Sequence, residues 1–217
     1  MAASYPIPLA DFLDGLRIRS VTFDLADKRG TTGLGSGLIQ TYEIAPRLWT
    51  GTVTLALGRT QTVRQAAAQV RRLQGVGATF LVSDQSALAP YADPDGTTLG
   101  ASTPTVHTLD SNNRDMRVQG LPSGYVLQRG DLLTIDQSNH LALHEIVTDT
   151  VTADGSGITP TFEVVPHIRP GAAVSDSVYL APAYCKAMIV PGSVQSTTHM
   201  PGKISDSIQF DFVQVLR

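Results

Sequence analysis

Apolar and polar residues alternate along much of this chain, with the period of two that is typical of half-buried β-strands. The clearest alternation covers residues 49–57, where Trp49, Val53 and Leu55 share one face and threonines occupy most of the other. A second alternation covers residues 17–25, and a third, at 206–216, ends the chain. The pattern therefore predicts a mainly β protein.

One segment has helical spacing instead. Between residues 62 and 74, apolar side chains recur at intervals of three and four residues, which predicts one amphipathic helix. Thr62 and Gln65 have the spacing of a capping box, in which each side chain bonds the other residue's free backbone N–H. Gly75 stands where such a helix is expected to end.

Short apolar runs separated by turn residues predict further strands. Residues 38–44 are expected to pair with 17–25, across a polar, glycine-rich connection at 30–37 that we interpret as a flexible hairpin loop. The even spacing of the later runs indicates a small barrel or sandwich. These later strands are expected at 116–118, 131–136, 140–148, 161–165, 177–180 and 185–190, and a short strand is expected at 79–82, directly after the helix.

The order of the elements predicts a discontinuous architecture. Residues 1–95 hold the first strands and the helix, and residues 96–190 form a compact β block that we interpret as an inserted, OB-like β-barrel. Because one more strong strand follows that block, residues 191–217 are expected to return and complete the first domain. The predicted fold is thus mainly β with one α-helix and an inserted small barrel.

Composition excludes several classes of protein. Charged residues make up only 16% of the chain and the net charge is −3, so no basic surface for gripping nucleic acid is expected. The single Cys185 excludes a disulfide framework within one chain and a multi-cysteine zinc site. We expect no membrane span and no signal peptide, and therefore folding in a reducing cytoplasm.

A search for chemical motifs finds no nucleophile elbow, no P-loop and no zinc-protease motif. His140 and His144 lie in a strand-like context, where they would be roughly 13 Å apart and unable to share a metal ion. Residues 93–96 and 110–115 resemble calcium loops but lack the full register, so Asx turns are expected there. Cys185 is expected to be buried. The sequence thus predicts no catalytic, cofactor-binding or metal-binding residues and no enzyme activity.

Several short motifs carry a resemblance to a known family. They are LWTG at 48–51, YADPDG at 91–96, LQRGD at 127–131 and VPHIRP at 165–170. This pattern of Trp, Gly-Asp and Pro-x-Ile-Arg resembles the distal tail proteins of long-tailed bacteriophages of siphovirus type. The resemblance covers most of the chain.

The resemblance implies a structural protein of the virion. Members of that family form a hexameric ring at the distal end of the tail, between the tail tube and the hub, tape-measure or receptor-binding proteins of the tip. Some members carry an inserted OB-like barrel, and none contributes catalytic residues. The implied location is the virion tail tip, after folding in the host cytoplasm. A slightly acidic chain suits a DNA conduit, because tight phosphate contacts would trap the genome.

Three alternatives remain open at this point. A host-glycan-binding β module would need exposed aromatic residues, and residues 96–190 contain only four candidates. A tail tube or terminator protein is the second alternative, although such proteins are usually single compact domains. A wall hydrolase is the third, and the absence of a nucleophile or metal motif argues against it. The four aromatic candidates are Tyr125, Phe162, Tyr179 and Tyr184.

Overall fold

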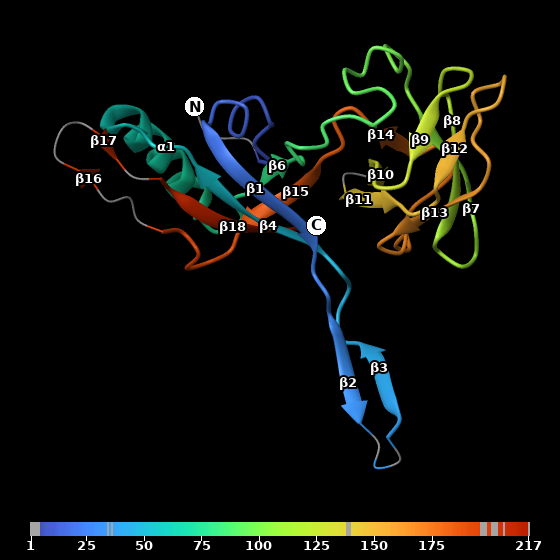
Figure 1. Cartoon of the computed structure of the whole chain (residues 1–217), viewed down its shortest axis with the longest axis horizontal. Coiled ribbons are helices and arrows are strands. Elements are labelled where there is room, and N and C mark those ends of the chain that lie inside the picture. The colour runs from blue at the N-terminus through green and yellow to red at the C-terminus, as the bar shows by residue number, and fades with distance from the viewer. Residues whose placement is uncertain are drawn as a thin grey trace.

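The computed structural model describes residues 5–33, 35, 37–137, 140–195, 199–200, 204–205 and 207–216. The protein is mainly β, with 40% strand and 7% helix, and it contains a closed six-stranded barrel. Figure 1 shows a sheet with a helix beside it, the barrel next to that sheet, and a two-stranded hairpin that projects away from both. Within the described residues, no helix is both long and apolar enough to cross a lipid bilayer.

The first sheet combines strands from both ends of the chain. All its pairs are antiparallel, and the last strand lies in the middle of the sheet, between two strands from distant parts of the sequence. Its inward side chains form one core with the helix, in which Val53, Val70 and Phe210 are almost fully buried. In spatial order the strands are β1 (Ile18–Leu25), β4 (Trp49–Leu55), β18 (Gln209–Gln214), β15 (Cys185–Ile189) and β6 (Phe80–Val82).

The predicted helix is confirmed as α1 (Thr60–Leu73), but its predicted cap is wrong. A two-residue strand, β5 (Gly58–Arg59), leads directly into the helix, so Arg59 is the N-cap and no side chain caps the first turn. Thr62 therefore lies inside the helix, where a capping box cannot form. The helix ends at Leu73, and Gln74 after it has a right-handed helical backbone conformation. Gly75 was expected to end the helix, but the glycine with positive φ after the helix is Gly77.

The predicted small β-barrel is present. Six antiparallel strands close it, one more than the five of a standard OB-fold. Its interior is filled by apolar side chains such as Met116, Leu133, Ile135 and Phe162. In spatial order the strands are β10 (Leu132–Gln137), β11 (His140–Ile146), β13 (Phe162–Val165), β8 (Asp115–Gln119), β7 (Thr105–Leu109) and β14 (Ser177–Tyr179).

Besides the hairpin, two small sheets lie next to the first sheet and the barrel. β9 (Val126–Gln128) pairs with β12 (Thr150–Thr152) in the barrel region. β16 (His199–Met200) and β17 (Ile204–Ser205) pair next to β5, near the helix. The last predicted strand is shorter than expected, because β18 begins at Gln209, and Asp206 lies outside the described residues.

Three strand predictions are corrected by the pairing. β3 (Ile39–Glu43) pairs with β2 (Arg29–Gly33) and not with β1, so residues 30–33 of the loop expected at 30–37 form part of a strand. β15 lies in the first sheet between β6 and β18, although residues 185–190 were assigned to the inserted block. The strand predicted at 49–57 is shorter than expected, because β4 ends at Leu55 and Leu57 is exposed. For β3 and β15, alternation identifies a strand but does not identify its neighbour.

Candidate assembly surfaces

The projecting hairpin carries the most prominent exposed apolar surface among the described residues. Leu38, Ile39, Tyr42 and Ile44 are all large and exposed, with 72% of Ile39 accessible. Every residue of β3 is exposed, so neither the sheet nor the barrel covers it. Exposed apolar patches occur at protein–protein interaction sites and in ligand-binding grooves, so the hairpin is a candidate interaction surface.

The hairpin has little means of stabilising itself. A two-stranded hairpin alone is marginally stable in water, because it buries almost no apolar area. Across its two strands, Gly30 faces Tyr42, and a Cβ at Gly30 would lie 2.6 Å from the Tyr42 ring. The glycine thus makes room for the aromatic ring to lie over the neighbouring strand. This packing orders the hairpin but leaves its other apolar side chains in solvent.

An ion pair fixes the point where the chain enters the hairpin. The Arg29 Nε donates to Asp27 Oδ1 at 2.9 Å, and Arg29 Nη2 donates to Asp27 Oδ2 at 2.7 Å. This side-chain hydrogen bond lowers the pKa of Asp27 to about 2. Since both side chains are more than half exposed, the pair contributes little stability and serves mainly to hold the backbone direction.

A second candidate surface is the outer edge of β1. β1 is the terminal strand of the first sheet, and none of the described strands pairs with its outer side. A groove of about 530 Å³ runs beside this edge, lined by Ile18, Val21 and Asp84 among others. Unpaired backbone N–H and C=O groups on an eight-residue edge are a template for a strand from another chain.

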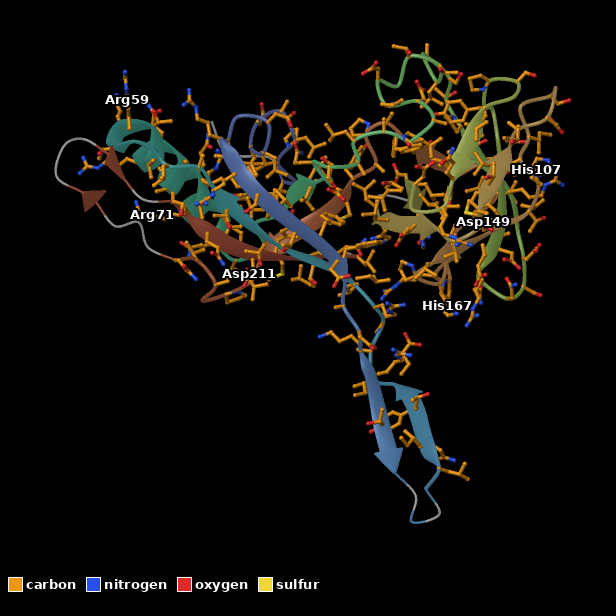
Figure 2. The ribbon with its side chains drawn as sticks, in the orientation of Figure 1. Arg59, Arg71, His107, Asp149, His167 and Asp211 are labelled. Atoms are coloured by element: carbon orange, nitrogen blue, oxygen red, sulfur yellow. The ribbon has the colours of Figure 1, made fainter. Side chains whose placement is uncertain are left out.

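The helix presents a basic face. Arg64, Arg71 and Arg72 are exposed, and the last two lie in the final turn, where they complement the helix dipole. Figure 2 places Arg59 and Arg71 at the end of the molecule that is opposite the barrel residues His107 and Asp149. This arrangement agrees with an ordinary solvated helix face.

The barrel offers little for a sugar to stack on. Tyr125 and Phe162 are buried, and the Tyr125 hydroxyl donates to Asp93 at 3.3 Å. Tyr179 and Tyr184 are half-buried and stack on each other, with ring centroids 5.2 Å apart. Their facing surfaces are therefore already occupied. Of the four aromatic candidates in the inserted block, only this pair reaches the surface.

The segments that resemble calcium loops and the single cysteine have structural roles. The Asx turn predicted at 110–115 is present, because the Asn112 amide oxygen accepts from the Arg114 N–H. The Asp93 carboxylate instead accepts from the Thr98 and Leu99 N–H groups, so its hydrogen bonds span a longer loop than the Asx turn expected at 93–96. Cys185 is fully buried, and burial raises the pKa of its thiol. No group of three or more potential metal ligands occurs among the residues that the structure describes.

His140 and His144 are separated as the strand context predicts. His140 is exposed at the start of β11, whereas only 1% of His144 is accessible. The His144 Nδ1–H donates to the Pro166 carbonyl oxygen at 2.8 Å. Burial lowers the pKa of His144 to about 4, so this imidazole is neutral at pH 7.

No protein-family model matches this chain, and no curated protein sequence matches it. The function is therefore inferred from the fold and from these surfaces. The exposed hairpin is the feature that sequence reasoning missed. Leu38, Tyr42 and Ile44 recur at even intervals, as in an ordinary half-buried strand, and the glycine-rich segment before them was the other signal.

Proposed function

We propose that this chain is a structural subunit of a bacteriophage tail, which assembles with copies of itself into a hexameric ring at the distal end of the tail. The observation that carries the proposal is the exposed apolar hairpin β2–β3, which lacks a covering partner within the described part of its own chain. The sequence resemblance to distal tail proteins supplies the biological setting.

The two candidate surfaces are suited to repeated contact between copies. The hairpin projects from one place on the chain, and the free β1 edge with its groove lies at another. When the hairpin of one copy contacts the edge region of the next, the contact is head to tail. Head-to-tail contacts close into a ring if the rotation between subunits closes. The free edge and the exposed apolar side chains are then covered together.

In this proposal the ring joins the tail tube on one side to the hub, tape-measure or receptor-binding proteins on the other, and it leaves a channel for DNA. The net charge of −3 favours a passage that does not hold phosphates tightly. The inserted barrel favours this proposal over the alternative of a tail tube or terminator protein, because such proteins are usually single compact domains. We propose no catalytic role and no cofactor.

The test is native mass spectrometry with negative-stain microscopy on the purified full-length chain. Six chains of 23.1 kDa give a ring of about 139 kDa with an open centre. The double variant Ile39→Ser/Ile44→Ser is expected to remain monomeric with an unchanged Tm, because both side chains are exposed in the monomer.

A matched control is Leu88→Ser/Val174→Ser, which removes two exposed apolar side chains away from the hairpin and should leave the ring intact. A chain that stays monomeric at its highest soluble concentration, or a ring that tolerates the hairpin variant, contradicts the proposal.

A further inference from the structure

A cavity of about 480 Å³ lies where the end of the hairpin, the barrel and the end of β18 meet. It is bordered by Arg47 after the hairpin, His144 on β11, Arg169 after β13, and Gln214 on β18. A second cavity of about 340 Å³ shares four lining residues with it. Both cavities are thus parts of one recess between segments that are far apart in the sequence.

The recess is lined by an excess of basic side chains. Arg47, Arg114 and Arg169 line it together with two histidines, whereas its lining contains two carboxylates, Glu43 and Glu163, of which Glu163 is paired with Arg114. A fourth arginine, Arg29, is already held by Asp27. In a chain with a net charge of −3, this is a local reversal of charge.

Two of these arginines form no ion pair with the carboxylates that the structure describes. Arg114 donates through Nε to His167 Nε2 at 2.6 Å and lies 3.9 Å from Glu163. Among the described residues, neither Arg47 nor Arg169 forms an ion pair. In addition, the Nε of Arg47 is buried and has no hydrogen-bond partner there. A buried guanidinium N–H without an acceptor is unfavourable, and an anion would satisfy it.

His144 adds an unsatisfied acceptor to the same recess. Since its Nδ1–H donates to the Pro166 oxygen, its Nε2 carries a lone pair, and this buried atom has no partner among the described residues. The recess thus combines orphaned or unpaired donors on arginine with an orphaned acceptor on a neutral histidine. A ligand that satisfies both needs anionic oxygens and one O–H group.

We propose that this recess binds a phosphate group that retains one proton, as inorganic phosphate does near neutral pH. Its anionic oxygens accept from Arg47 and Arg169, whose planar guanidinium groups suit oxyanions, and its hydroxyl donates to the Nε2 of His144. Because Arg47 follows the hairpin and Arg169 belongs to the barrel, the bound group connects the two. Figure 2 shows His167 at the edge of the barrel that faces the start of the hairpin.

The test is isothermal titration calorimetry of the full-length chain with sodium phosphate, in a phosphate-free buffer at constant ionic strength. We expect saturable binding to one site, weaker binding of sulfate because it lacks the O–H donor, and no heat with sodium chloride. Arg47→Gln and Arg169→Gln should each weaken phosphate binding about tenfold or more. Arg129→Gln, at an exposed arginine paired with Asp149, is the matched control and should not change it.

A second arm uses the unmodified protein, so it does not depend on variants that fold. Phosphate is expected to shift the imidazole NMR signals of His144, whereas chloride should not. A parallel titration with glycerol phosphate distinguishes a phosphomonoester from free phosphate as the tighter ligand. Absence of saturable binding, sulfate binding as tight as phosphate, unchanged affinity in both arginine variants, or an unshifted His144 signal overturns the proposal.

Discussion

The indole of Trp49 joins the first sheet to the barrel: its Nε1–H donates to the carbonyl oxygen of Leu143 at 2.8 Å. Trp49 begins β4 and Leu143 lies in β11, 94 residues further along the chain. Only 4% of Trp49 is accessible, and Leu143 packs in the same core as the sheet. Gln214 on β18 makes a parallel contact through its Nε2 to the Leu141 oxygen at 3.3 Å. The two bodies therefore share a buried junction with directional bonds.

Replacing Trp49 with Phe should destabilise the protein. The variant keeps an aromatic ring but removes the N–H and part of the buried volume, so we expect a loss of about 1–3 kcal/mol in the free energy of unfolding. Urea unfolding followed by far-UV circular dichroism measures this, since the only tryptophan is lost. Tyr91→Phe, at an exposed ring, is the control and should change stability little. Equal stability of both variants would show that the junction contributes nothing.

Gly51→Ala should severely damage the first sheet. Gly51 lies between β1 and β18, and an added Cβ would overlap the Thr22 carbonyl oxygen and lie 2.6 Å from Phe212 Cζ. Because a backbone oxygen cannot move aside cheaply, we expect a loss of more than about 3 kcal/mol or insoluble protein. Gly33→Ala, where nothing lies within 4 Å, should express normally. Soluble yield and urea unfolding compare the two, and a stable Gly51→Ala protein would contradict the described packing.

His144 should make stability fall in mild acid. Burial lowers the pKa of His144 from 6.5 to about 4, so between these values the unfolded chain binds more protons than the folded chain. Stability therefore rises with pH across this window and is lost as the pH falls. For this fully buried group the loss amounts to about 3 kcal/mol between pH 7 and pH 4.

The variant His144→Asn isolates this contribution. Asparagine can still donate an N–H to the Pro166 oxygen, but it does not titrate. Urea unfolding of both proteins at several pH values from 7 to 4 should show a steeper decline for the wild type. Parallel curves would mean that His144 is protonated equally in the folded and unfolded chains.

Cys185 should be inert towards thiol reagents in the folded protein. Its side chain is fully buried, and burial raises the thiol pKa, which suppresses the reactive thiolate. With Ellman's reagent at pH 8, we expect no release of chromophore from native protein and release of one equivalent in guanidinium chloride. Rapid reaction of the native protein would contradict this prediction. It would indicate that β15 separates easily from β6 and β18, the two strands with which it pairs.

Local patterns predicted the elements better than their partners. The alternation that starts at Trp49 and the helical spacing around Val70 each report which side of a segment is buried, and that information is local. Alternation does not specify which strand pairs with β3 or in which sheet β15 lies, because several strands of this chain have the same pattern. The capping prediction at Thr62 failed because the competing start at Arg59 depends on β5, which pairs with the distant β17.

The candidate surfaces were harder to predict for related reasons. Leu38, Tyr42 and Ile44 recur at the even intervals of a half-buried strand, and only the folded chain reveals that none of the described residues covers them. The recess around Arg47, His144 and Arg169 draws on residues up to 173 positions apart, from Glu43 to Leu216, and their spacing in the sequence does not indicate that they meet. An arginine such as Arg47 is of interest in this recess because no acceptor is paired with it among the described residues, and only the folded structure shows this.

The pairing of β6 with β15 has a consequence for how such a protein changes over generations. Val82 and Cys185 are facing partners in adjacent antiparallel strands, so everything between them departs and re-enters at points about 5 Å apart. A tight turn could close that gap. The hundred or so residues between these two partners can therefore change in length without altering the strand order of the first sheet, provided that the contacts of Trp49 and Gln214 with β11 are replaced.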